Sequence, residues 1–467
     1  MAAAPSNLVE GGVSTAGPPG RSRSPMSRIF DRALSFPVAA AFVLALLTFV
    51  IGRSRFDDRD TWWHLKVGES IWSTHALPHS DQYSYTTHAH AWIPHEWLAE
   101  VSMAGAYNAG GNRGLLLWLC ALGSLTFLLT YALCSLCAAS ARIGLLGGLA
   151  ALFFGTVGLA IRPLVLGYVF LAAELLFIYL ARTRNRRWLW ALPPLFAVWV
   201  NCHGSFLFGL VVLGVFVCGS LLAQPLGRIV PDDWARQERR LLCAVFAVSA
   251  VALLANPVGP RLAAYPFDLL LKQKDNLAMA PEWAALNVQD PRGAALCGLG
   301  GLLLLLFLVR RPPLRADEAL LLALGFGTAI LHVRMLFGFG ILVAPVLCRL
   351  LADAWGRQGA PARSNRSVNA MIILGCVAVM ILSFPTSAQI ERQIRRAEPV
   401  EAVDFIRRTG LAGPMLNDYK WGGYLIWALP EQKVFIDSRM DVFDWTGVLG
   451  DYRRWAAMAE DPQRLLD

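Results

Sequence analysis

Hydrophobic residues along this 467-residue chain are gathered in long blocks that short polar segments separate. A helix needs roughly 17–25 apolar residues to cross a bilayer. The blocks predict eleven membrane helices, at residues 36–52, 114–138, 143–160, 164–181, 188–202, 204–224, 241–256, 293–309, 317–331, 335–351 and 369–386. The expected fold class is therefore an all-α polytopic membrane protein with a transmembrane domain over residues 36–391.

The rest of the chain divides into a tail, two long loops and a C-terminal segment. Residues 1–35 are rich in Ala, Gly, Pro and Ser and are expected to be disordered. The long loops are residues 53–113 and 257–292. In residues 392–467, PVEAVDFIRRTG and WGGYLIWAL have helical patterns, whereas PMLN and KVFID have strand patterns. This segment is predicted to be a small α/β unit, and whether it is complete at Asp467 is left open.

Composition supports the membrane class and excludes others. The chain is 56% hydrophobic and 16% charged, against about 45–50% and 25% in soluble domains. In a membrane protein, a net charge of +9 more often reflects an excess of Lys and Arg in cytoplasmic loops than binding to nucleic acid. The nine cysteines lie in or beside apolar blocks and predict no disulfide framework.

Basic residues indicate which side of the membrane each loop occupies. With the N-terminus inside, nineteen arginines between Arg21 and Arg366 fall in cytoplasmic segments, as the positive-inside rule requires. The same parity places all eight histidines outside. We therefore expect a protein of the cytoplasmic (inner) membrane with a cytoplasmic N-terminus and an extracytoplasmic C-terminus.

The first outer loop carries an acidic cluster that includes Asp58 and Asp60. The neighbouring Trp62 and Trp63 are expected to anchor this cluster at the lipid head groups. A carboxylate held there suits a general base, while an ordinary solvated flank is the alternative. A second alternative is a divalent cation bound by Asp58, Asp60 and His64, although no metal is firmly expected.

Polar residues also interrupt the outer ends of later helices. They are Arg162, Asn201, His203, Glu282, His332 and Arg334. Ionisable residues at membrane depth are costly and usually mark a site, so we expect a pocket for a phosphate or diphosphate. The alternatives are a snorkelling side chain for Arg162 and an interface anchor for Glu282.

The ordered motifs resemble a family of bacterial multi-pass proteins related to the C-type membrane glycosyltransferases. The motifs are DRDTWWHLKVG, PHSDQYSYT and HEWLAE in the first loop, then Arg162-Pro163, WVNCHG, NPVG, PEW, HVR, NDYKWGGYLIW and KVFIDSR. The resemblance implies a polyprenyl-phosphate-linked sugar as donor and Asp58 or Asp60 as base. His64, His95 and Glu96 belong to these motifs and join the candidate substrate-binding residues.

The function that follows is glycosyl transfer from a polyprenyl-phosphate sugar to an unknown acceptor at the outer face of the membrane. A transporter or flippase of lipid-linked saccharides is one alternative, and a non-catalytic membrane protein of envelope assembly is another. Transporters often contain internal repeats and polar residues at the membrane midplane. The sequence contains no evident repeat, and its polar residues gather at one face, which favours the transferase. The sugar and any protein partners stay open.

Overall fold

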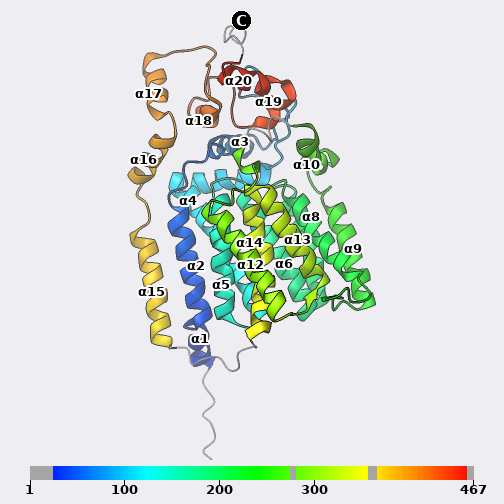
Figure 1. Cartoon of the computed structure of the whole chain (residues 1–467). Coiled ribbons are helices and arrows are strands. Elements are labelled where there is room, and N and C mark those ends of the chain that lie inside the picture. The colour runs from blue at the N-terminus through cyan, green and yellow to red at the C-terminus, as the bar shows by residue number, and fades with distance from the viewer. Residues whose placement is uncertain (1–24, 274–279, 356–364, 460–467) are drawn as a thin grey trace, which may run out of the picture.

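The computed structural model describes residues 25–273, 280–355 and 365–459, which form a helical bundle with a folded cap over one end (Figure 1). The longer bundle helices are α2 (Phe36–Gly52), α4 (Trp97–Ala138), α5 (Ala141–Gly155), α6 (Leu164–Thr183), α7 (Leu192–Trp199), α8 (Phe206–Ser220), α9 (Arg236–Ala252), α12 (Pro291–Val309), α13 (Ala316–Leu331), α14 (Leu336–Trp355) and α15 (Arg366–Leu382). The end of the bundle beneath the cap is called the capped end below.

The cap is built from the first long loop, part of the second and the C-terminal segment. Its helices are α3 (Thr61–Thr74), α10 (Pro260–Lys272), α16 (Ser387–Ala397), α17 (Val400–Thr409), α18 (Tyr419–Ala428), α19 (Met440–Thr446) and α20 (Val448–Ala456). At the opposite end, β1 (Ile229–Val230) and β2 (Leu314–Arg315) pair in parallel. Short 3-10 turns complete the chain: η1 (Thr156–Gly158), η2 (Arg186–Ala191), η3 (Pro281–Trp283) and η4 (Val333–Met335).

Each predicted membrane span coincides with helix, so the helical, multi-pass class is confirmed. Among the described residues, five helical stretches are long and apolar enough to cross a bilayer, and the bent pair of α15 and α16 would make a sixth. Helices α2 and α8 are apolar but shorter. The number of eleven spans therefore stays a prediction.

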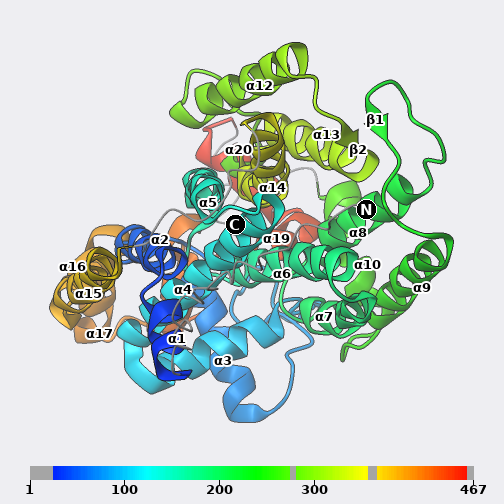
Figure 2. The same cartoon turned by 90° about the horizontal axis from the view of Figure 1, so that it is seen from below.

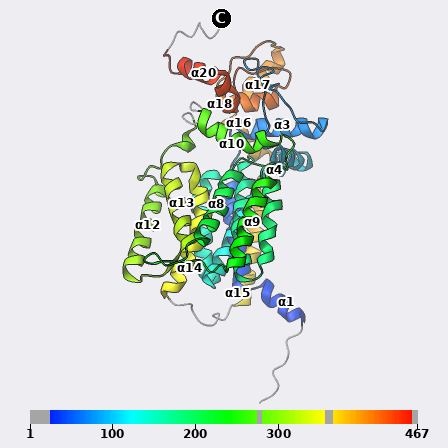
Figure 3. The same ribbon diagram turned by 90° about the vertical axis from the view of Figure 1, so that its right-hand side faces the viewer.

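Helix α14 lies at the centre of the bundle, and α9, α12 and α15 lie at its edge (Figures 2 and 3). In the most apolar window of Val333–Trp355 83% of the residues are buried, against 17% in α12. Glycine lets α14 approach α5 closely: a Cβ atom on Gly340 would lie 3.0 Å from Cα of Ala151. Close backbone contact of this kind is typical of packed membrane helices.

Helix α4 changes direction at two glycines before it enters the bundle. Gly110 and Gly111 have non-helical backbone angles, and φ at Gly111 is +58°. Only glycine adopts such a conformation without strain. The break separates a cap-level section of α4 from the section predicted to span the membrane from residue 114.

The cap has its own apolar core, and this corrects the expected role of two tryptophans. Trp62 and Trp63 are 1% and 6% exposed, so they are buried in the cap and do not lie at the head groups. Trp62 donates a hydrogen bond to Glu398 (3.0 Å) and packs against Trp427. The C-terminal segment, about 330 residues away, thus covers the face of α3 that sequence reasoning assigned to lipid.

Two further expectations are corrected by the structure. The predicted strands PMLN and KVFID are reduced to isolated bridges, with Val434 paired to both Met415 and Ser84. In the region predicted to be disordered, residues 25–33 form helix α1 (Pro25–Ala33), while residues 1–24 lie outside the described part. The helix predicted for WGGYLIWAL is present as α18, and the missing side chain of Gly422 lets it pack against the carbonyl oxygen of Ile436.

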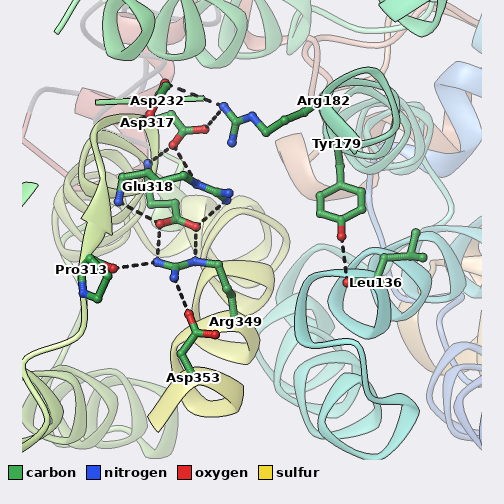
Figure 4. Close-up of polar contacts among 10 residues, drawn as sticks. Leu136, Tyr179, Arg182, Asp232, Pro313, Asp317, Glu318, Arg349 and Asp353 are labelled. Carbon is green, nitrogen blue, oxygen red and sulfur yellow. Dashed lines mark hydrogen bonds and ion pairs between the residues drawn. The ribbon is translucent and has the colours of Figure 1, made fainter. Parts of the chain in front are cut away.

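A buried ion network joins the helices at the end opposite the cap (Figure 4). Arg182 at the end of α6 donates to Asp317 at the start of α13 (2.5 Å) and lies 3.8 Å from Asp232. Arg349 on α14 pairs with Glu318 on α13 and with Asp353 (2.7 Å). Asp317 and Glu318 are 1% and 3% exposed, so their charges depend on these partners.

We predict that Arg182→Ala destabilises the protein by roughly 3–5 kcal/mol, because the buried Asp317 carboxylate loses its nearest cation. Chemical unfolding of the purified protein in detergent measures the difference. Arg187→Ala, at an exposed position a turn further on, is the matched control and should change little. Equal stability of Arg182→Ala and the wild type would contradict a structural role for the network.

Candidate functional site

A cavity of about 480 Å³ lies at the capped end, between the bundle and the cap. Nine of the eleven residues proposed from the sequence line it: Asp60, His64, His95, Glu96, Arg162, His203, Glu282, His332 and Arg334. The other two lie directly behind the lining. Asp58 contacts Arg162, and Asn201 accepts a hydrogen bond from Trp97 (2.8 Å). Residues that are far apart in the sequence therefore meet in one place.

Arg162 is the centre of an ion cluster that we call the Arg162 cluster, made by Arg162, Asp58, Asp60, Glu282 and Arg334. Its guanidinium lies 3.1 Å from Asp60, 2.9 Å from Glu282 and 3.6 Å from Asp58. Glu282 also pairs with Arg334, whose guanidinium lies 5.5 Å from the ring of Trp283. Arg162 thus has acidic partners in the protein, which argues against a side chain that merely snorkels to water.

Local structure explains how these side chains are held. Asp60 precedes the first turn of α3, and its backbone N–H donates to Oδ1 of Asp58 (3.0 Å). That bond leaves Oδ2 of Asp58 to face Arg162. Arg162 itself sits in the tight connection between η1 and α6, where Pro163 starts the helix. His332 lies 2.7 Å from the carbonyl oxygen of Trp283 and so fixes the turn that carries Glu282.

Two of the three acids that contact Arg162, Asp58 and Glu282, differ in their proton affinity. Burial raises the pKa of Asp58 to about 6, and Arg162 acts in the opposite direction. Burial also tends to raise the pKa of Glu282, but Arg334 and Arg162 hold it below its ordinary value. Asp58 therefore gains a proton near pH 6 while Glu282 stays ionised.

A second cluster surrounds Glu96 with three histidines. Its carboxylate lies 3.2 Å from His203, 3.5 Å from His64 and 3.8 Å from His95. His64 also contacts Glu100 (2.9 Å) through its other ring nitrogen. Nδ1 of His203 accepts a bond from the backbone of Ser205, so Nε2 carries the proton toward Glu96 when the ring is neutral.

Burial sets the protonation of this second cluster. It raises the pKa of Glu96 to about 8, although Arg334 opposes the shift. It also lowers the pKa of His203 well below its usual value, and the positive charge of Arg334 adds to that effect. At neutral pH, Glu96 is therefore mainly a protonated acid among neutral rings, and the cluster can store or pass on a proton.

The metal site considered from the sequence is not formed by the described residues. Asp58 and Asp60 face Arg162, whereas His64 points to Glu96 and Glu100. Among the residues that the structure describes, no group of three or more His, Cys, Asp or Glu side chains has a geometry suited to a metal ion. The short sequence spacing was misleading because α3 turns His64 away from the two aspartates.

Other polar lining residues were not predicted from the sequence. They include Tyr265 on α10, Arg439 directly before α19 and Asp441 on α19. The hydroxyl of Tyr265 donates to Asp441 (2.9 Å), and Arg439 is 2% exposed. One signal was available, since the segment KVFIDSRMDVF places an arginine and two aspartates among apolar residues. Its position over the cavity depends on the folding of the cap and could not be read from the pattern.

The fold has solved counterparts. The oligosaccharyltransferase of Archaeoglobus fulgidus, tethered with an acceptor peptide that contains the NVT sequon, has a TM-score of 0.57 at 13% identity, covering 86% of this chain and 64% of that chain. Its apo form gives a TM-score of 0.51 at 13% identity, covering 85% and 64%. This chain thus spans about 64% of the length of that enzyme.

A weaker similarity is to ArnT from Cupriavidus metallidurans bound to undecaprenyl phosphate, with a TM-score of 0.46, 15% identity and coverage of 91% of this chain and 77% of that chain. No known protein family and no curated protein matches the chain by sequence. The match to the oligosaccharyltransferase shows that this chain shares its fold, which agrees with the resemblance that the sequence motifs indicated.

We predict that Glu96→Gln becomes more stable than the wild type as the pH rises. The unfolded carboxyl titrates near its ordinary value of 4.5 and the folded one near 8, so the wild type loses stability between these two values. Gln imitates the protonated acid and escapes this loss. Unfolding curves at pH 5 and pH 9 should show a relative gain on the order of 1 kcal/mol or more.

The matched control for this pH experiment is Glu391→Gln, at an exposed position on α16. Its stability should follow the wild type at both pH values. A constant difference between Glu96→Gln and the wild type from pH 5 to pH 9 would show that Glu96 does not retain a proton in the folded protein.

Proposed function

We propose that this protein is a membrane glycosyltransferase that moves a sugar from a polyprenyl-phosphate donor to an acceptor. The observation that carries the proposal is a single cavity that joins the Arg162 cluster to an apolar wall from the bundle. Leu207, Phe208 and Val211 of α8 contribute to this wall. A lipid with a charged head group needs both surfaces at once.

The arginines supply the contacts for the donor phosphate in this proposal. Arg334 has one carboxylate partner among the described residues, Glu282, and lines the cavity. Nε of Arg162 has no hydrogen-bond partner in the described part of the chain. Arginine binds phosphate through paired N–H groups. Both side chains can therefore exchange some of their hydrogen bonds to Glu282 for hydrogen bonds to the donor phosphate.

Asp60 is the better placed of the two candidate bases. It lines the cavity, whereas Asp58 reaches it through Arg162. In the proposed reaction Asp60 accepts the proton of an acceptor hydroxyl while the oxygen attacks the anomeric carbon. The bond from that carbon to the phosphate oxygen breaks, and polyprenyl phosphate leaves with the negative charge that Arg334 and Arg162 stabilise. Asp58 would position Arg162.

The capped end is proposed to face the outside of the cytoplasmic membrane. All eight histidines lie in the cap or at the helix ends beneath it, and the arginine-rich connections lie at the other end. That separation agrees with the positive-inside rule. Since the ionisable lining gathers at one end of the bundle, it also favours a transferase over a flippase, which must carry its head group across the membrane.

We predict that Asp60→Asn lowers glycan product by about 10²–10⁴-fold, since a general base typically contributes that much. Asp58→Asn should cause a smaller loss because Arg162 keeps Asp60 and Glu282 as partners. Product is measured by mass spectrometry of lipid-linked and envelope glycans in a complemented deletion strain at matched protein levels. The deletion strain also identifies the sugar that accumulates on the lipid.

Asp57→Asn is the matched control, because Asp57 is an exposed neighbour in the same acidic cluster. It should keep full activity. If Asp58→Asn and Asp60→Asn both retain wild-type product, the base lies elsewhere and the transferase proposal loses its main support.

A further inference from the structure

The part of the cavity lining that comes from the C-terminal segment has a different chemistry from the Arg162 cluster. We call it the tail wall and define it as Ser438, Arg439 and Asp441 with Tyr265 and His95, all of which line the cavity. Helix α19 and the residues before it carry the first three of these. The proposed reaction gives none of them a task.

Arg439 is held rigidly by residues of the first loop and of its own segment. Its guanidinium donates to Asp437 (2.9 and 2.6 Å) and to Asp81 (2.8 Å). Its Cζ atom lies 5.0 Å from the ring centre of Tyr83 and 4.9 Å from that of Trp92. Its remaining nitrogen, Nη1, has no hydrogen-bond partner among the described residues. A buried donor without a partner costs free energy, which a bound ligand can recover.

Other polar atoms of the tail wall are also without partners in the described part of the chain. They are Oγ of Ser438 and Nδ1 of His95. The carboxylate of Asp441 accepts a hydrogen bond from the hydroxyl of Tyr265. No cation among the described residues pairs with this carboxylate. Asp441 is 6% exposed, so it is a hydrogen-bond acceptor that is largely shielded from solvent. The wall therefore offers both donors and an acceptor to a ligand.

The balance of charge decides which ligand suits this wall. The positive charge of Arg439 already faces Asp81 and Asp437, and Asp441 adds a third carboxylate. Three acids beside one guanidinium repel a phosphate. They suit a neutral group whose hydroxyls donate to a carboxylate and accept from a guanidinium N–H.

The tail wall also offers an aromatic surface. The ring of His95 stacks on that of Tyr265 with centroids 4.1 Å apart, and burial, although Asp441 opposes it, lowers the pKa of His95 so that the ring is neutral at pH 7. A sugar ring has apolar C–H faces that pack on such aromatic rings and hydroxyls that need polar partners at its edge. A hydrocarbon chain would leave the polar atoms unpaired.

We propose that the tail wall is the subsite that binds the sugar ring of the lipid-linked donor, while Arg162 and Arg334 bind its phosphate. Asp441 and Arg439 would then determine which sugar the protein accepts. This inference rests on the proposed function and adds a specificity site to it. It also assigns the C-terminal segment a direct part in substrate recognition.

The test compares a lipid phosphate with and without a sugar. The probes are undecaprenyl phosphate and the same lipid carrying glucose, mannose, galactose or arabinose, titrated into the protein in nanodiscs. We expect the wild type to bind at least one sugar-bearing lipid about 10-fold or more tightly than the sugar-free lipid, as hydrogen bonds to charged groups allow. Asp441→Asn should abolish that preference and leave the affinity for undecaprenyl phosphate unchanged.

Three further variants make the result specific. Ser438→Ala removes an unpaired hydroxyl at little risk to folding and should reduce the sugar preference about 2- to 5-fold. Arg334→Ala should weaken binding of both kinds of lipid. Asp404→Asn, at a half-exposed position on α17 that does not line the cavity, is the matched control and should change neither affinity.

Two results would overturn the subsite. One is equal binding of every sugar-bearing lipid and the sugar-free lipid by the wild type. The other is an equal loss for both kinds of lipid in Asp441→Asn, which would give Asp441 a structural role. If the wild type binds none of the lipids, the proposed function itself fails and the subsite falls with it, so the two failures are distinguishable.

Discussion

The ion pairs of Arg162 hold the two halves of the site together. The guanidinium comes from a tight turn in the bundle, Asp58 and Asp60 come from the first loop, and Glu282 comes from the second. Removing a buried partner leaves an uncompensated charge, which is far more costly than the net gain of forming the pair. These pairs therefore tie both outer loops to the turn before α6, and they act together with the apolar packing that joins the cap to the bundle.

The carboxyl groups of the site differ in protonation state because their surroundings differ. Glu282 stays ionised between two arginines, Asp58 has a pKa raised to about 6 and gains a proton only below that pH, and Glu96 among histidines has a pKa raised to about 8. Groups with separated proton affinities can divide the tasks of charge stabilisation and proton transfer. The same low polarity that raises the pKa of Glu96 strengthens the contacts that Arg334 can make with a phosphate.

Much of the fold and of the candidate site could be predicted from the sequence, and the reason is physical. Apolar blocks of sufficient length must form helices in a membrane, because backbone groups have no other partners there. Arg162 and Arg334 stood out because charged residues in apolar surroundings require counter-charges. Glu282, considered equally well as an interface anchor, proved to be the counter-charge of both.

Long-range packing accounts for what the sequence could not reveal. Trp62 and Trp63 have the composition of an interfacial anchor, but the C-terminal segment covers them. Arg439 and Asp441 line the cavity, and their segment is placed by α18: Gly423 packs against the start of α3, and Gly422 packs against Ile436 and Asp437. These contacts have no local signal in the sequence. The metal site considered for Asp58, Asp60 and His64 is not formed for a similar reason, since proximity in sequence did not determine where α3 directs His64.

We propose that the cavity holds the head group of a lipid-linked sugar. Cryo-electron microscopy of the protein in nanodiscs with a saturating polyprenyl-phosphate sugar tests it most directly. We expect density for the phosphate beside Arg162 and Arg334 and for the lipid chain along the wall of α8. Head-group density elsewhere would contradict the claim, for example in the apolar groove that α2, α4 and α15 form beside Arg113.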